Sequence, residues 1–125
     1  MWKDTIEHLA APGQPDRLAE AQAVAEYSDV VLLVVGLDET LEGEEGDTGN
    51  SDASGDKKDL EFPEPQKKLM DQILECKKPV ILVNMTGSAM NLSVAEEKAA
   101  AIIQAWYPGA RGGKAVSDVI FGEKS

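Results

Sequence analysis

The sequence predicts an α/β protein: a three-layer α/β/α sandwich with a mainly parallel sheet, flavodoxin-like in appearance. Three observations predict this fold class. The 125 residues, 42 % of them hydrophobic, suffice for one compact core. Short apolar runs without period-two alternation are typical of strands covered on both faces of a parallel sheet. Segments with helical periodicity separate these runs, and the alternation indicates right-handed βαβ units.

The predicted strands are three apolar runs, each too short to be a buried helix. The first two runs are rich in the β-branched residues Val and Ile. The three runs are Val30 to Val35, Val80 to Val83 and Ala101 to Trp106.

The first two predicted helices show one apolar stripe each. The segment 15–27 places Leu18, Ala21 and Ala25 on its stripe. The segment 63–77 does the same with Leu69, Ile73 and Cys76. Both stripes are expected to face the sheet.

Two further helices are predicted from their end signals. Ser93 followed by Glu96 has the form of a capping box, which opens a short helix through Ala99. The segment 112–121 is the last helix, and Gly122 is its expected stop. Its apolar positions, expected to face inward, are Val116, Val119 and Ile120.

One connection is abnormally long. Residues 37–62 form a loop of 26 residues with ten carboxylates, whereas connections in α/β units usually have ~2–6 residues. Such a loop is either disordered or wrapped around a ligand, and the sequence leaves both interpretations open. The rest of the chain divides into a connecting or frayed segment, 1–14, and a partial sandwich domain, 15–125.

The same topology predicts where a ligand binds. In open parallel sheets, ligands bind beyond the carboxyl ends of the strands. Three loops leave the predicted strands at this edge, and we expect the site to be built from them. They are the segments 36–62, 84–92 and 107–112.

Charge and composition exclude several classes of partner. The chain has 23 acidic and 12 basic residues, for a formal net charge of −11. Nucleic acids and anionic membranes require a basic face, so neither is an expected partner. Cys76 is the single cysteine and cannot form an internal disulfide. The amino terminus lacks the pattern of a signal peptide, so a cytoplasmic protein is expected.

A cluster of carboxylates follows the first predicted strand almost at once. It reads Glu42-Gly43-Glu44-Glu45-Gly46-Asp47. A carboxylic acid kept partly protonated by neighbouring like charges can protonate a leaving group. Glycoside hydrolysis requires two carboxyl groups that flank the scissile bond, one acting as acid and the other as nucleophile or base.

Several motifs in the right order resemble one family. The segment 28–44 resembles the strand and acidic loop in the second domain of family 3 β-glucosidases and β-xylosidases. The segment 60–66 resembles that family's entry to its next helix, and 79–88 its strand ending in a Gly-Ser turn. The run Ile103 to Gly109, the pair Gly112-Gly113 and the segment 118–122 are similar to its most recognisable tail. The resemblance covers residues 16–125, and it implies that the sandwich domain is incomplete at both ends.

The resemblance implies a function. In that family the acid/base glutamate lies on the acidic loop, and the nucleophilic aspartate comes from a preceding (β/α)8-like barrel, for which 125 residues leave no room. Glu44 or Glu45 is the best acid/base candidate, and Glu42 is the next. Thr48 stands where the family often has arginine, so the resemblance does not single out one glutamate.

The whole protein would then be a retaining β-glycosidase acting on terminal β-linked sugars. Neither a metal nor a cofactor is expected, and this chain alone is expected to be inactive, because an acid without a nucleophile cannot complete the reaction. The sequence predicts no oligomeric state.

Two other functions remain open. The chain could be a stand-alone α/β module that binds a ligand or metal through its acidic loop, or a regulatory or interface domain of an oligomer. Six residues match positions of a calcium loop, although Lys57 stands where an apolar residue is usual. These six are Asn50, Asp52, Ser54, Gly55, Asp56 and Glu61.

Overall fold

The computed structural model describes residues 17–38, 41–42 and 57–124. The segment 1–14 and most of the acidic loop lie outside these residues. The elements in chain order are α2 (Arg17–Tyr27), β1 (Val31–Gly36), α3 (Glu64–Leu74), β2 (Val80–Met85), α4 (Ser93–Lys98), β3 (Ala101–Gln104), η2 (Gly109–Arg111) and α5 (Gly112–Ile120). Among the described helices, none is both long and apolar enough to span a membrane.

The three strands form one parallel sheet in the order β1-β2-β3, which confirms the predicted fold class. Gly36 at the end of β1 lies opposite Met85 at the end of β2. Asn84 lies opposite Gln104 at the end of β3. This register brings the carboxyl ends of all three strands level with one another, so the loops that follow them start side by side.

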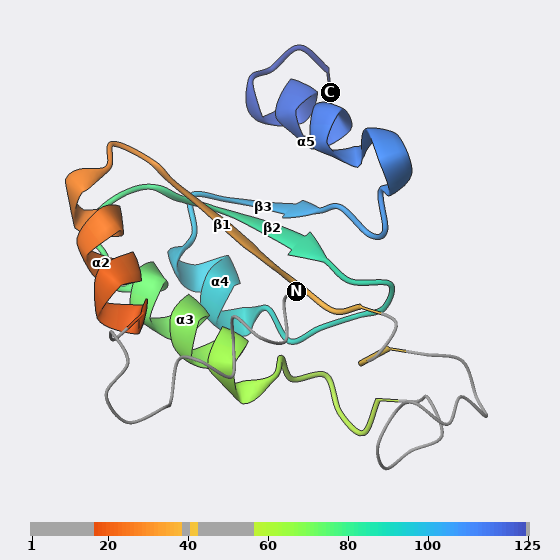
Figure 1. Cartoon of the computed structure of the whole chain (residues 1–125), viewed down its shortest axis with the longest axis horizontal. Helices are drawn as coiled ribbons and strands as arrows, with labels where there is room; N and C mark the ends of the chain where they lie inside the picture. Colours follow the sequence, from red (N-terminus) through yellow and green to blue (C-terminus); the bar gives the residue numbers. More distant parts are fainter. Residues whose placement is uncertain (1–16, 39–40, 43–56, 125) are drawn as a thin grey trace.

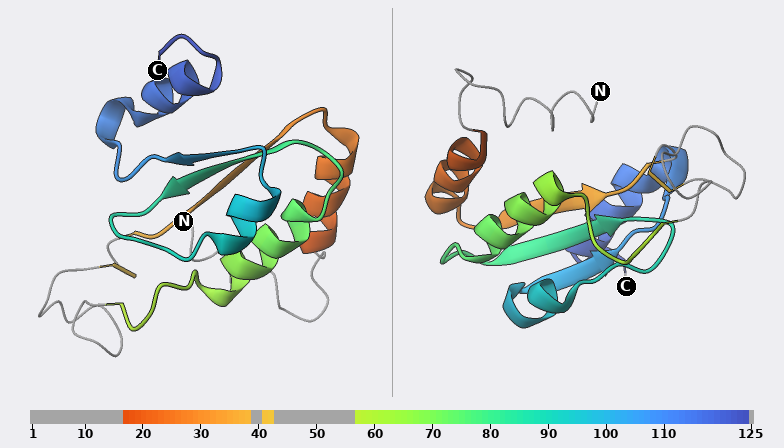
Figure 2. Two further views of the ribbon diagram at one scale, coloured as in Figure 1. Left: turned by 180° about the vertical axis from the view of Figure 1, so that it is seen from behind. Right: turned by 90° about the horizontal axis from the view of Figure 1, so that it is seen from below.

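Helices lie on both sides of the sheet (Figures 1 and 2). α2, α3 and α4 lie on one side, and α5 lies on the other. The core is formed between the sheet and the first group of helices. Leu33 and Val35 of β1 and Leu82 of β2 are buried there, against Ile73 and the other core residues of α3. The inward stripes of α2 and α3 follow the predicted pattern, since Ala25 and Ile73 are both buried.

The opposite face of β1 differs from the prediction. Leu32 is 52 % exposed and Val34 is 37 % exposed, so among the described residues this strand is covered on one face only. α5 has the predicted extent and ends before Gly122, whose φ of 73° suits glycine. Val119 of α5 was expected to face inward and is 45 % exposed, because little of the described chain packs against that helix.

The predicted capping box at the start of α4 is wrong. Ser93 is already the first helical residue, and Leu92 occupies the cap position without a side-chain bond. The Ser93 hydroxyl is instead bonded to Asn91, because Asn91 Oδ1 accepts hydrogen bonds from both the N–H and the hydroxyl of Ser93. β3 is also shorter than predicted, since it ends at Gln104 and Trp106 adopts a φ of 56°.

Candidate functional site

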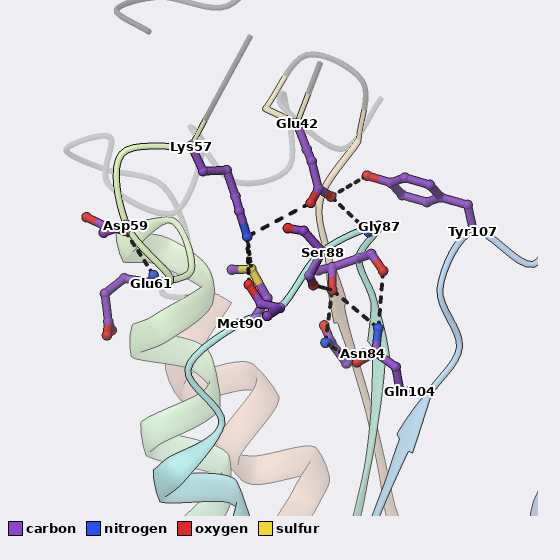
Figure 3. Close-up of polar contacts among 12 residues, drawn as sticks. Glu42, Lys57, Asp59, Glu61, Asn84, Gly87, Ser88, Met90, Gln104 and Tyr107 are labelled. Atoms are coloured by element: carbon purple, nitrogen blue, oxygen red, sulfur yellow. Dashed lines mark hydrogen bonds and ion pairs between the residues drawn. The ribbon is translucent and has the colours of Figure 1, made fainter. Parts of the chain in front are cut away.

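The loops after the three strands meet at one edge of the sheet, as predicted (Figure 3). Glu42 comes from the loop after β1, Gly87 and Ser88 come from the turn after β2, and Tyr107 follows β3. A short turn brings Glu42 back toward the sheet, because the Asp38 carbonyl accepts hydrogen bonds from the N–H groups of residues 41 and 42. The first carboxylate of the acidic cluster is thus held above the strand ends.

The Glu42 carboxylate is held by two donors from different loops. Its Oε2 accepts a hydrogen bond from the Gly87 N–H at 2.9 Å and another from the Tyr107 hydroxyl at 2.5 Å. The side chain is only 12 % exposed. Hydrogen bonds to an ionised carboxylate are stronger than hydrogen bonds between neutral groups, so these two bonds fix the Glu42 side chain in one orientation.

The second oxygen of Glu42 has a different environment. Oε1 is buried and makes no hydrogen bond within the described part of the chain, and the same is true of the neighbouring Ser88 hydroxyl. A compensating charge comes from Lys57, whose Nζ lies 3.9 Å from Oε1. This ammonium also donates to the carbonyl of Ala89 at 2.7 Å and to the sulfur of Met90 at 3.1 Å.

These neighbours lower the pKa of Glu42 below its ordinary value of 4.5. Burial acts in the opposite direction and raises the pKa of this carboxyl. The combined effect of the nearby Ser88 hydroxyl, the two donors on Oε2 and the Lys57 charge is larger than that of burial. Glu42 is therefore an anion at neutral pH.

Tyr107 stays protonated at neutral pH. Burial and the adjacent Glu42 carboxylate raise the pKa of Tyr107 to about 12, because both disfavour a phenolate. Its hydroxyl consequently remains a hydrogen-bond donor to Glu42.

A buried polar network shapes the turn that carries Gly87. The Asn84 amide donates to the Thr86 hydroxyl at 3.0 Å and to Gln104 Oε1 at 2.6 Å. Thr86 in turn donates to the Ser88 carbonyl at 2.9 Å. Asn84 and Thr86 are completely buried, so these bonds form where water cannot replace them. The network aims the Gly87 N–H at Glu42.

Besides the contacts of Glu42, a double hydrogen bond on Gly36 fixes the start of the acidic loop. The Gly36 N–H donates to Gln66 Oε1 at 2.9 Å, and Gln66 Nε2 donates to the Gly36 carbonyl at 2.7 Å. This side chain from α3 thus satisfies the last residue of edge strand β1, which needs partners beyond the sheet ladder.

The predicted site residues have different outcomes. Glu44 and Glu45 lie outside the described residues, and Glu42 lies in the cluster above. Five of the six calcium-loop residues also lie outside. The sixth, Glu61, already has both oxygens engaged, by Asn91 and Lys67. Within the described ranges, no three His, Cys, Asp or Glu side chains come together to hold a metal ion.

The groups that contact Glu42 were not predicted from the sequence. Tyr107 appeared only as part of the tail motif, and Gly87 only as a turn residue. A usable signal was present, because both directly follow predicted strands at the edge where Glu42 was placed. Lys57 carried no comparable signal, since its neighbours in sequence are also charged.

The lowered pKa of Glu42 predicts a pH-dependent stability. A folded-state pKa below 4.5 means that the ionised form stabilises the fold fully above that value and less as pH falls through the folded-state pKa. Glu42→Gln should therefore lower the urea midpoint of the chain at pH 7, and the difference from the unchanged chain should shrink toward pH 3. Glu97→Gln, on the exposed side of α4, serves as the control. A difference that stays constant with pH would contradict the prediction.

Comparisons with known proteins agree with this architecture. Residues 3–125 match the family model described as the glycosyl hydrolase family 3 C-terminal domain. The chain is 40 % identical over 94 residues to a xylan 1,4-β-xylosidase of Xylanibacter ruminicola, which covers 74 % of this chain and 11 % of that protein. It is 38 % identical over 118 residues to a β-xylosidase of Formosa agariphila, covering 94 % of the chain and 14 % of that protein.

Solved structures give the same result. A β-glucosidase of Erythrobacter marinus superposes with a TM-score of 0.73 at 32 % identity, covering 91 % of this chain and 15 % of that one. A family 3 β-glucosidase of Bifidobacterium adolescentis gives a TM-score of 0.70 at 30 % identity, covering 90 % of this chain and 15 % of that one. The chain thus spans between a tenth and a sixth of the length of these relatives. By its motifs, its parallel sheet and these matches, the chain belongs to the C-terminal domain of glycosyl hydrolase family 3.

Proposed function

We propose that this chain is the acid/base part of a retaining β-glycosidase that hydrolyses terminal β-linked sugars, of the β-glucosidase or β-xylosidase type. The nucleophilic carboxylate comes from a barrel domain elsewhere in the full-length protein. The named relatives are β-xylosidases and β-glucosidases, and each is several times longer than this chain. A larger protein with a second domain fits this difference in length.

One observation carries the proposal. The acidic loop starts at the carboxyl edge of the sheet and is held there by two other loops, through Glu42. Ligands of open parallel sheets bind at this edge. A carboxylic acid on the same loop would therefore stand at the rim of the domain, where a sugar bound in a neighbouring domain can be reached.

Among the three glutamates, the contacts of Glu42 favour Glu44 or Glu45 as the acid/base group. A general acid must be protonated at the working pH and must reach the glycosidic oxygen. Glu42 is held as an anion, and its free oxygen is buried. Its negative charge instead raises the pKa of a nearby carboxyl group, which helps that group to keep its proton.

The chemistry divides between the two carboxylates. The acid glutamate protonates the departing oxygen while the nucleophile attacks the anomeric carbon and forms a covalent glycosyl-enzyme ester. The same glutamate, now an anion, then removes a proton from water, which attacks the anomeric carbon and releases the nucleophile. Two displacements at one carbon retain its configuration.

The test compares the full-length protein with the 125-residue chain. The full-length protein is expected to hydrolyse a nitrophenyl β-glucoside or β-xyloside, and proton NMR should show the β-anomer as the first product. The isolated chain should give no turnover with either substrate, because it lacks the nucleophile. The α-anomer as first product, no hydrolysis by the full-length protein, or turnover by the chain alone would each contradict the proposal.

A further inference from the structure

We propose that Glu42, Gly87 and Tyr107 form a latch that fixes the start of the acidic loop, and that Glu42 and Tyr107 are positioning residues for the acid/base glutamate. This inference builds on the proposed function for its catalytic consequence. The latch itself follows from the contacts of Glu42.

The latch joins three loops that are far apart in sequence. Glu42 is 45 residues from Gly87 and 65 residues from Tyr107, yet one oxygen, Oε2, accepts hydrogen bonds from both. The loop after β1 is thereby tied to the turn after β2 and to the segment after β3 (Figure 3). A single side chain therefore connects the start of the acidic loop to both of the other loops.

The two donors also make contacts of their own, although Tyr107 is 52 % exposed. A Cβ atom added at Gly87 would lie 2.5 Å from a ring carbon of Tyr107, so the tyrosine ring packs directly on the glycine backbone. The polar network through Asn84 and Thr86 holds the Gly87 turn from below. Donors fixed in this way lose little freedom when they bind the carboxylate, which favours one geometry of the latch.

The hydrogen-bond donors and the cation around Glu42 favour its anionic form. Tyr107 and the Gly87 N–H approach Oε2, while Lys57 approaches Oε1 and the Ser88 hydroxyl lies beside it. Asp38 is close enough to raise the pKa of Tyr107, which keeps that hydroxyl protonated as a donor. The surroundings thus favour a fixed anion, which suits an anchor and not a proton donor.

Chain geometry transmits the position of Glu42 to its neighbours. Glu44 and Glu45 follow Glu42 by two and three residues in the sequence, and each residue of extended chain spans at most about 3.6 Å. Loss of the latch would free Glu42 from the other two loops, and the residues that follow it in the chain would then move with it. A misplacement of about 1 Å at a catalytic group can cost about a hundredfold in rate.

The first experiment measures the latch in the 125-residue chain. The pKa of Glu42 is followed by carbon-13 NMR of its carboxyl group in the unchanged chain and in Tyr107→Phe. Tyr107→Phe removes one donor, so the pKa of Glu42 should rise toward 4.5. Tyr27→Phe is the matched control, because Tyr27 is 93 % exposed and has no role in the latch. An unchanged Glu42 pKa in Tyr107→Phe would overturn the latch.

The second experiment measures positioning in the full-length protein. Tyr107→Phe and Glu42→Gln should each lower kcat about 10- to 100-fold on an alkyl β-glycoside while KM changes little. The double variant of Tyr107→Phe with Glu42→Ala should be no worse than Glu42→Ala alone, because Glu42→Ala already removes the acceptor of the Tyr107 hydroxyl. Glu42→Gln should also shift the alkaline limb of kcat/KM to lower pH, since it removes a negative charge beside the acid. Tyr27→Phe and Glu97→Gln should match the unchanged protein, and equal activity in Tyr107→Phe would overturn the positioning role.

A chemical rescue separates an anchor from the acid/base residue. When an acid/base glutamate is replaced by alanine, azide can enter the vacated space, attack the anomeric carbon of the glycosyl-enzyme and release the nucleophile carboxylate. Glu42→Ala should give no β-glycosyl azide. Formation of that product would identify Glu42 as the acid/base group and overturn the inference. If the full-length protein showed no glycosidase activity, the proposed function and the positioning role would both fail, and the NMR titration would still decide whether the latch exists.

Discussion

Replacing the acid/base glutamate in the full-length protein is expected to lower kcat by about 100- to 10,000-fold on substrates with poor leaving groups. We expect this loss in either Glu44→Gln or Glu45→Gln, depending on which of the two glutamates is the acid. The amide retains the size of the side chain but cannot donate the proton that the departing oxygen needs. A factor of this size corresponds to about 3–5 kcal/mol of transition-state stabilisation.

Steady-state kinetics with two substrates check this expectation. An alkyl β-glycoside needs the proton, whereas a dinitrophenyl β-glycoside leaves readily without it. The acid variant should therefore lose far more activity on the first substrate, and its kcat/KM should no longer fall at alkaline pH. Full activity in both Glu44→Gln and Glu45→Gln, on both substrates, would exclude this pair and leave Glu42 as the acid.

Gly36→Ala is expected to lower the free energy of unfolding by about 2 kcal/mol or more. An added Cβ would lie 2.2 Å from the Met85 carbonyl oxygen and 2.9 Å from its carbon. Both are backbone atoms, so the contact cannot be relieved by rotation of a side chain. The ends of β1 and β2 would have to separate, which would also disturb the double hydrogen bond between Gly36 and Gln66.

Urea denaturation of the 125-residue chain measures this effect. Gly113→Ala is the matched control, because an added Cβ there meets no atom within 4 Å and the residue lies in α5. The control should be neutral or more stable by up to about 1 kcal/mol, since alanine favours helix more than glycine does. Equal midpoints for Gly36→Ala and the unchanged chain would show that the strand ends can move apart at little cost.

The strands could be predicted because their signal is local. The run from Val30 to Val35 contains no charge and is too short for a helix, and the structure places β1 at Val31–Gly36. The start of α4 shows the limit of such local signals. Ser93 and Glu96 have the spacing of a capping box, but Asn91 lies two residues earlier and takes the hydrogen bonds of Ser93.

The exposed face of the sheet was mispredicted for a related reason. A continuous apolar run indicates burial on both faces. Leu32 and Val34 are nevertheless exposed in the described part of the chain. An apolar run shows that both faces of a strand can be buried, but it does not show whether another element covers each face.

The sequence by itself determined the order of strands and helices, the parallel sheet that this order favours, and the edge at which the acidic loop lies. These follow from apolar runs, helical periodicity and the handedness of βαβ connections, all of which are properties of neighbouring residues. Only the tertiary structure decided that Glu42 is held by Gly87 and Tyr107. That contact depends on the register of three strands and on the exact bend of three loops, and residues 45 and 65 positions apart carry no local signal of each other.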